Sequence, residues 1–512
     1  MSDRALPRAL GFATALAMAL TQAAVGFVRD EGYYFTAAQR VEEWLRLLAR
    51  APFAAIQQTE RYWSYNFEHP GLSKLLFGAS HLLFTTWTRL LPSALAWRLP
   101  AFVFAGLLSY WLCVLGLSRS RAAGVLAPLS FWCAERTFFH GHLAAFDVPI
   151  CALWAGAGVA WLQAIREPAI RARLWLALVV GLALGVKHNA WFLPPVLAVH
   201  ALLLPREERR RALSTLPWML LSPLVLFAVW PLLWHDPLRH LGDWIAFHSR
   251  HVHYAWWYLG QVLRGPPFPV AYPLVVDALA LPLPTVALLA AAGASLLAGF
   301  FRRRLDAQRL LELGLAGAAL APFLLRTTPI FGGIKHWLAF VALLTPEAAH
   351  LLTRLAPSRR ALMAASAAAL LPGIWQIGHL HPYGTSAYGE LAGGVPGAAT
   401  LGMQRQYWSN NVTAVLPWLN AHCPLGARVF FHEVNVESYR AYVEAGMLRP
   451  DLRPVFQPAD ADYAALQWHR EFRDREPETW NAFGTRRPAT GLYLDEVPQI
   501  VVYARAGMPG AP

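Results

Sequence analysis

Acidic residues stand at the ends of two apolar segments of this chain. Asp30 and Glu31 directly follow an apolar stretch that ends near Phe27, and Asp147 precedes a second one. A carboxylate at the water end of a membrane helix lies beside lipid head groups and can still reach a water-soluble reactant. Within hydrogen-bond reach of a hydroxyl group, it can act as a general base. The two positions therefore suggest chemistry at a membrane surface.

Each position also has a purely structural explanation. Asp30 and Glu31 could be solvated acids at the terminus of an interfacial helix. Asp147 is followed by Pro149, and an Asp just before a helix with Pro in its first turn is a common start signal. At Asp147 the structural and the chemical role can hold together.

The composition indicates a protein whose solvent is mostly lipid. Of the 512 residues, 56% are hydrophobic and 15% are charged, whereas an ordinary soluble domain carries roughly 25% charged residues. Apolar stretches of about 18 residues can cross a bilayer. They predict about eleven spans, at residues 9–27, 97–117, 121–139, 148–165, 172–188, 190–204, 213–233, 272–298, 310–326, 336–353 and 360–377. The acidic pair behind the first span, and the many later spans, favour an uncleaved helix over a signal peptide.

The net charge of +13 reflects the topology of the chain rather than a nucleic-acid partner. Arg residues cluster in short connections, and such loops of membrane proteins face the cytoplasm. With the amino terminus inside, the first helix carries Asp30 and Glu31 to the outer face. We treat 97–117 as the next span and residues 72–91 as interfacial helices. This choice places every Arg-rich loop inside and Asp147 outside.

The composition becomes more polar after about residue 378. A helix is predicted at residues 410–421, strands at 427–432 and 499–503, and a second helix at 439–446. These elements predict a small α/β domain at residues 379–512, on the outer side. The expected membrane domain is then 1–378, and its first outer loop covers about 28–96.

Seven short motifs occur in an order that is typical of one enzyme family. They are DEGYY from Asp30, NFEHPGLSKLL from Asn66, RLP from Arg98, Arg136 ahead of FDVP from Phe146, GLALGVKHNA from Gly181, the pair Pro266-Pro267, and GGIKH from Gly332. Together they resemble the protein O-mannosyltransferase and aminoarabinose-transferase-like group of GT-C glycosyltransferases. The resemblance covers about residues 25–340, and the tail matches only in general character.

The resemblance implies a multi-span GT-C enzyme that takes a sugar from a polyprenyl-phosphate carrier by direct inverting displacement. Asp30 matches the family's first-loop acid and is the expected general base. Glu31 is its neighbour and the weaker catalytic candidate, because it is less suited to point inward. Asp147 matches the second-loop acid, which holds the acceptor or orients the site. Glu68 matches an acidic position of some relatives, with a surface acid as the equal alternative.

The leaving group of this reaction is a lipid phosphate, whose developing negative charge needs cations. Arg and Lys suit phosphate, and an uncompensated charge in lipid is costly. Snorkelling toward head groups is the alternative for each cation. The candidates for contacts to the donor phosphate or sugar are Arg136, Lys187, His188, Asn189, Lys335, His336, Glu68, His69 and Lys74.

A metal site has weaker support. His248, His251 and His253 could supply imidazoles, and Asp30 with Asp147 could supply oxygens, but the spacing is not a specific zinc signature. We interpret the histidine-rich loop, about residues 234–271, as an interfacial belt or a substrate wall. No metal ligand is assigned, and a divalent cofactor such as Mg or Mn stays open.

The expected function is sugar transfer at the periplasmic face of the bacterial inner membrane. The acceptor could be protein Ser/Thr, lipid A or another glycolipid, or a polysaccharide. A transporter or flippase of lipid-linked sugars is an alternative, but it would carry charged residues near mid-span and paired broken helices. A non-catalytic membrane scaffold of the same fold is a second alternative. The presence of Asp30, Asp147 and the cations argues against it.

Overall fold

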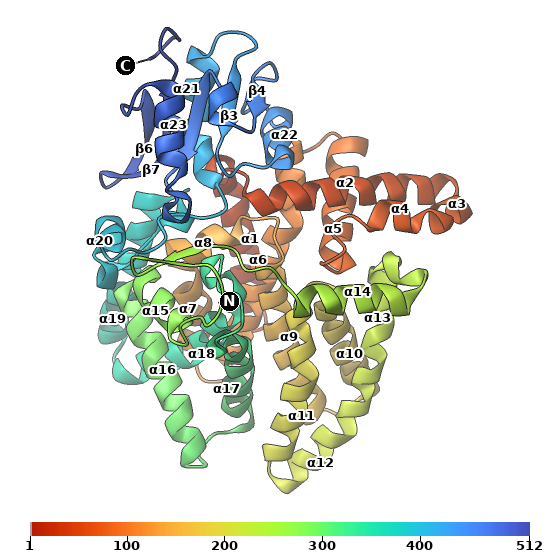
Figure 1. Ribbon diagram of the computed structural model, residues 1–512. Coiled ribbons are helices and arrows are strands. Elements are labelled where there is room, and N and C mark those ends of the chain that lie inside the picture. Colours follow the sequence, from red (N-terminus) through yellow and green to blue (C-terminus); the bar gives the residue numbers. More distant parts are fainter. Residues whose placement is uncertain (1–2, 512) are drawn as a thin grey trace.

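A computed structural model describes residues 3–511 of the chain. It consists of a helix bundle and, at one end of the bundle, a smaller domain with a β-sheet (Figure 1). The bundle comprises α1 (Leu6–Thr21), α6 (Ser93–Leu117), α7 (Arg121–Trp132), α8 (Glu135–Gly141), α9 (Asp147–Arg166), α10 (Ile170–Leu184), α11 (Leu193–Leu203), α12 (Arg206–Thr215), α13 (Ser222–Val229), α15 (Tyr272–Ala280), α16 (Leu283–Phe301), α17 (Ala307–Leu320), α18 (Leu338–Leu355) and α19 (Arg359–Leu380).

Small residues let the bundle helices approach closely. A Cβ atom on Gly11 of α1 would lie 2.8 Å from the carbonyl oxygen of Gly106 of α6. In the other direction, a Cβ atom on Gly106 would lie 2.6 Å from the carbonyl oxygen of Gly11. Contacts between small residues are the usual packing mode of helices in lipid, where burial of apolar surface supplies no drive for helices to associate.

Within residues 3–511, six helices are long and apolar enough to cross a membrane, or seven if the bent pair α1–α2 counts as one. The six are Ser93–Leu117, Asp147–Arg166, Arg206–Val229, Leu283–Phe301, Leu338–Leu355 and Arg359–Leu380. The predicted number of eleven is thus not confirmed. Several predicted spans are shorter than expected or are divided into two elements. The run 121–139 divides into α7 and α8, and the run 310–326 leaves the α-helical form after Leu320.

The first outer loop, predicted at about 28–96, is largely helical. It contains α2 (Arg29–Arg50), α3 (Pro52–Gln57), α4 (Thr59–Trp63) and α5 (Gly71–His81), followed by a π-helical segment at Leu82–Trp87. The chain bends by 108° between the first helix and α2. As a result, α2 lies across the end of the bundle (Figure 1). The helix α12, which follows α11, and the connection after α16 lie at the opposite end of the bundle, and both carry clustered Arg residues.

The smaller domain contains a five-stranded mixed sheet in the order β4-β3-β5-β7-β6. Its strands are β3 (Arg428–Phe431), β4 (Arg453–Val455), β5 (Tyr463–Gln467), β6 (Thr490–Leu494) and β7 (Val497–Ala504). The strands β4, β3 and β5 are parallel, and β7 is antiparallel to both β5 and β6. Side chains alternate between the two faces: Phe430 and Leu466 pack with Phe483, whereas Val429 and Ala465 join the main core.

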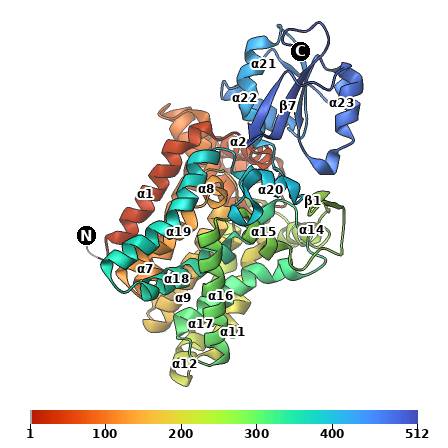
Figure 2. The same ribbon diagram turned by 90° about the vertical axis from the view of Figure 1, so that its left-hand side faces the viewer.

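Most predicted elements of the tail are present in this domain. The strands expected at 427–432 and 499–503 correspond to β3 and to part of β7. The helix expected at 439–446 is α22 (Val436–Glu444). The helix expected at 410–421 is divided, because a 3₁₀ turn at Asn410–Ala414 precedes α21 (Leu416–His422). The domain stands beyond α2 and α20 (Gly394–Thr400) in the view of Figure 2.

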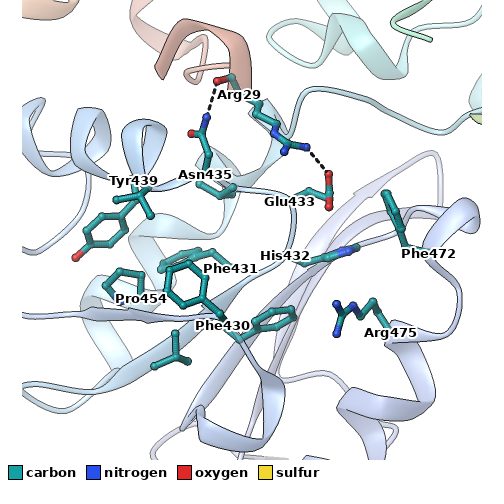
Figure 3. Close-up of a pocket in the computed structure, with 14 residues that line it drawn as sticks. Arg29, Phe430, Phe431, His432, Glu433, Asn435, Tyr439, Pro454, Phe472 and Arg475 are labelled. Atoms are coloured by element: carbon teal, nitrogen blue, oxygen red, sulfur yellow. Dashed lines mark hydrogen bonds and ion pairs between the residues drawn. The ribbon is translucent and has the colours of Figure 1, made fainter. Parts of the chain in front are cut away.

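The sheet domain is fastened directly to the start of α2. Arg29 binds Glu433 at 2.9 Å, and the side chain of Asn435 donates a hydrogen bond to the carbonyl oxygen of Arg29 (Figure 3). Gly32 allows the close approach, since a Cβ atom there would lie 2.5 Å from the backbone nitrogen of Ser438. The residue that follows Arg29 is Asp30, so these contacts fix the position of that acid.

Candidate active site

A cavity of about 370 Å³ lies between α2, the end of the bundle and α14 (Pro237–Ser249). Both acids that the sequence places at helix mouths, Asp30 and Asp147, line it. The other predicted site residues in its wall are Lys187, His188, Asn189, Lys335, His336, Glu68 and His69. These residues come from segments up to about 300 positions apart, and the fold brings them to one surface.

Two carboxylate–lysine pairs stand in this cavity. The ammonium group of Lys335 lies 3.3 Å from Oδ2 of Asp30, and that of Lys187 lies 2.6 Å from Oδ1 of Asp147. The Asp30 side chain is 27% exposed, whereas that of Asp147 is 7% exposed. Asp30 is therefore the more accessible acid, and Asp147 is held in a buried ion pair.

A glycine explains why Lys335 can reach Asp30. Gly332 has a φ of +84°, and a Cβ atom there would lie 2.4 Å from Cε of Lys335. Only glycine adopts this backbone conformation without strain. The ammonium group of Lys335 also lies 4.1 Å from the ring centre of Trp408, a cation–π contact. The GGIKH motif thus aims the lysine at the cavity.

The phenol of Tyr34 stands among the acids of the cavity. Burial raises the pKa of Tyr34 well above its ordinary value, and the negative charges of Asp30, Asp147 and Glu68 raise it further. The phenol therefore keeps its proton at neutral pH and can donate a hydrogen bond to a substrate oxygen. Tyr34 belongs to the DEGYY motif, from which no role for this phenol is predicted.

Several polar atoms of the cavity wall are buried without a hydrogen-bond partner. They are Nδ1 of His69, Nδ1 of His188 and Oδ1 of Asn189, together with Oδ1 of Asn66. Buried polar groups of folded proteins are normally paired. Unpaired donors and acceptors around a cavity are what a site for a polar ligand needs.

Burial keeps two imidazoles of the cavity wall, those of His69 and His248, neutral at physiological pH. Burial lowers the pKa of His69 well below its ordinary value, and the nearby charge of Lys187 lowers it further. Burial likewise lowers the pKa of His248 to about 4. His248 packs on His188, with ring centres 4.0 Å apart, and His251 also lines the cavity. These contacts make part of the histidine-rich loop a wall of the cavity.

Glu31 lies outside this cavity, and we correct its catalytic assignment. Its carboxylate accepts hydrogen bonds from Arg98 at 2.7 and 2.8 Å, and from the backbone nitrogens of Val28 and Ala144. The residue is fully buried. Successive helix residues point about 100° apart, so α2 turns Asp30 toward the cavity and Glu31 into the core.

Arg136 and Lys74 also lie away from the cavity wall. Arg136 is buried and donates hydrogen bonds to the carbonyl oxygens of Thr385 and Ala387. The ammonium group of Lys74 donates to the carbonyl oxygen of Asn66 at 2.9 Å, and burial lowers its pKa to about 7. Both residues hold chain segments in place, and their expected contacts to the donor are not supported by these positions.

The residues in the cavity do not fit a resident divalent cation. Asp30 and Asp147 each face a lysine ammonium group, which neutralises the carboxylate that a hard cation would need. Within residues 3–511, no three His, Cys, Asp or Glu side chains converge as metal ligands.

A second cavity, of about 600 Å³, adjoins the first. Asp30, Glu68 and Lys335 line both. The remainder of its wall includes residues of the sheet domain, such as Glu433 and His469. Beyond Arg29 and Glu433 lies a smaller cavity of about 270 Å³ at the end of β3 (Figure 3).

No protein-family model and no curated protein sequence matches this chain. Among solved structures, the chain is similar to the structure of ArnT from Cupriavidus metallidurans bound to undecaprenyl phosphate. The TM-score is 0.52, at 14% identity over 98% of both chains. The apo structure of the same ArnT gives a TM-score of 0.52 at 13% identity over 96% of this chain and 97% of that one. The archaeal oligosaccharyltransferase AglB from Archaeoglobus fulgidus gives 0.46 at 10% identity, over 88% and 65%. The similarity to the two ArnT structures shows that this chain has the fold of ArnT.

Proposed function

We propose that this protein is an inverting glycosyltransferase of the bacterial inner membrane. It takes a sugar from a polyprenyl-phosphate carrier and transfers it to a hydroxyl acceptor at the periplasmic face. In this proposal residues 1–378 form the catalytic membrane domain and residues 379–512 a periplasmic domain. The similarity of the whole chain to ArnT, whose structure holds undecaprenyl phosphate, supports a lipid-phosphate donor.

One observation carries the proposal: Asp30, Asp147, Lys187 and Lys335 line a single cavity at the end of the bundle where the sheet domain stands. An acceptor hydroxyl must lose its proton as it attacks, and a departing lipid phosphate must gain cationic partners. A cavity that holds both acids and both lysines offers these functions within one space.

Asp30 is the proposed general base. It is the more exposed of the two acids, and it lines both cavities, so an acceptor from the second cavity can reach it. The acceptor oxygen forms a bond to the anomeric carbon as the bond to the phosphate oxygen breaks. The acceptor proton passes to Asp30, and the electron pair of the broken bond stays on the phosphate. A single displacement of this kind inverts the anomeric centre.

Lys187 and Lys335 are the proposed partners of the phosphate. Both have mostly buried side chains, each 9% exposed, and both line the first cavity. In such a low-dielectric place an ammonium group stabilises a developing negative charge more than it would in water. Asp147 orients Lys187 through the 2.6 Å contact. The lysines supply the positive charge, so the proposed reaction needs no divalent metal.

A transfer assay tests this function. The purified full-length protein is incubated with radiolabelled undecaprenyl-phosphate sugars and a membrane glycolipid extract. We expect label to move from the carrier to the extract, and the Asp30→Asn variant to lose about 10²- to 10⁴-fold in rate, as for loss of a general base.

The matched control is Asp243→Asn, which removes an exposed acid of α14 that does not line the cavity. This variant should transfer at the rate of the natural protein. Transfer that survives Asp30→Asn unchanged would remove the general-base assignment. A protein that transfers no sugar from any of the carriers would contradict the proposed function.

A further inference from the structure

The second cavity receives its outer wall from the sheet domain. Between β5 and α23 (Arg475–Phe483), the chain contributes His469, Glu471 and Phe472, and Glu433 follows β3. On the other side the cavity opens to Asp30. A molecule in this space would therefore touch both the sheet domain and the proposed base.

Two side chains of this wall carry polar atoms with no partner. His469 is 7% exposed and Glu471 is 6% exposed. Nδ1 of His469 lies 3.1 Å from the Glu471 carboxylate, and Gln404 donates to the same carboxylate at 2.6 Å. Nε2 of His469 and Oε2 of Glu471 remain without a hydrogen-bond partner. Burying a polar atom without a hydrogen-bond partner costs folding free energy, unless a ligand or a water molecule pairs with it.

The charge of the second cavity disfavours a phosphorylated acceptor. Four carboxylates line it, from Asp30, Glu68, Glu433 and Glu471, against the cations Arg29 and Lys335 and the imidazole of His469. Arg29 is paired with Glu433, and Lys335, which also lines the first cavity, is the proposed partner of the donor phosphate. A phosphate group would meet net negative charge here, whereas hydroxyl and ammonium groups would find acceptors for their hydrogen bonds.

Aromatic faces complete the wall. Trp256, Trp408 and Phe472 line the cavity together with Tyr254. Apolar and aromatic surface combined with a few convergent polar groups is the usual character of a site for an organic ligand. Flat rings beside carboxylates and an imidazole suit a sugar ring, which has apolar faces and a rim of hydroxyl groups.

We infer that the second cavity is the acceptor subsite and that it takes a neutral or aminated sugar, whose hydroxyl group it presents to Asp30. This inference rests on the proposed function and specifies its acceptor. It agrees with the need for a base: a neutral hydroxyl must lose a proton to attack, whereas a phosphate oxygen is already ionised. The carboxylates thus favour a glycan hydroxyl of a glycolipid or polysaccharide over a phosphate, and the aromatic wall favours it over a protein side chain.

Saturation-transfer NMR on the full-length protein in lipid nanodiscs tests the inference without any transfer reaction. The probes are methyl β-glucoside, methyl β-glucosaminide, methyl glucoside 6-phosphate and a Ser/Thr-rich peptide. We expect saturation transfer to the first two and a much weaker signal for the phosphorylated sugar and the peptide. Glu471→Gln removes a charged acceptor and should weaken sugar binding about tenfold.

Phe472→Ala is the second variant, since it removes part of the aromatic wall and leaves the polar groups. It should also weaken sugar binding. Glu478→Gln is the matched control, because Glu478 is an exposed acid of α23 outside this cavity, and binding should stay unchanged. Binding of undecaprenyl phosphate, measured on the same samples, reports that each variant is folded.

The outcomes separate the inference from the proposed function. Equal or stronger binding of the phosphorylated sugar would overturn the inference. So would binding of the peptide alone, or sugar binding that neither Glu471→Gln nor Phe472→Ala changes. If the sugars bind as expected but no carrier-linked sugar is ever transferred, the proposed function fails and the sugar subsite stands.

Discussion

The two ends of the helix bundle both hold acids paired with cations, yet the pairs differ in their surroundings. Toward the end away from the sheet domain, Arg119 and Arg309 bind Glu312 and Glu347. Every carboxylate oxygen there has a donor, including Ser295 and Gln308. At the other end, the pairs of Asp30 and Asp147 line a cavity whose wall also holds unpaired polar atoms.

This contrast shows that a buried ion pair alone does not mark a reaction site. In the Arg119 network both carboxylates are saturated with donors, although Nη1 of Arg119 has no hydrogen-bond partner. The network connects α17 to α18, which is a structural role. The Asp30–Lys335 and Asp147–Lys187 pairs line a cavity whose wall also holds polar atoms without hydrogen-bond partners. A buried pair next to a cavity can exchange a partner for a substrate group, whereas a saturated network cannot.

Among the variants that distinguish the two kinds of ion pair, the largest effect is expected when each pair is replaced as a unit. In Asp147→Asn with Lys187→Met, both charges disappear, so no unpaired buried charge is left and stability should change little. The rate of sugar transfer should fall by about 10²- to 10³-fold, because a cationic partner of the phosphate is lost. The transfer assay and thermal unfolding of the same preparation measure the two quantities.

The counterpart in the saturated network is Arg309→Met with Glu347→Gln. This change should leave the transfer rate of the folded protein unaltered. If the two double variants lost transfer equally, the distinction between the two ends of the bundle would disappear.

A smaller effect is expected at Gly332. Alanine there would be strained at a φ of +84° and would displace the side chain of Lys335. Misplacing a catalytic group by about 1 Å can cost about 10²-fold, so we expect transfer to fall between about 10- and 100-fold. Gly242→Ala is the control, because a Cβ atom there would meet nothing within 4 Å. Rates that are equal for the two alanine variants would show that Gly332 does not position Lys335.

The smallest effect concerns pH and the sheet domain. Burial opposes the charged form of His469, but Glu471 favours it more, and the pKa of His469 is raised above its ordinary 6.5. The pair of His469 and Glu471 therefore stabilises the folded protein fully below pH 6.5. This stabilisation is lost as the pH rises through the raised pKa of His469. The melting temperature should fall over that window in the natural protein and fall less in His469→Asn. If the melting temperatures of the natural protein and of His469→Asn changed identically with pH, the stabilising role of the His469–Glu471 pair would be contradicted.

The sequence identified much of this site because its signals are local. Asp30 and Asp147 are recognisable by their place beside apolar segments, and Lys335 by its glycine-rich motif. The expected contact of Arg136 with the donor is not supported, because its hydrogen-bond partners, Thr385 and Ala387, lie about 250 positions away in the chain. No local sequence pattern indicates these hydrogen bonds.

Two further features were not readable from composition. Several of the breaks that shorten predicted spans stand at prolines, such as Pro282 before α16 and Pro322 after α17, which a count of apolar residues overlooks. The contribution of His469 and Glu471 to a cavity beside Asp30 depends on the docking of the sheet domain on α2. That second feature is a property of tertiary structure.

In the proposed mechanism, the cavity beside α2 holds the lipid phosphate against Lys187 and Lys335. The most direct measurement is an electron cryomicroscopy structure of the full-length protein with undecaprenyl phosphate. We expect the phosphate within hydrogen-bond distance of both ammonium groups and beside Asp30. Density for the phosphate at the Arg119 end of the bundle, or at the cavity but remote from both lysines, would contradict it.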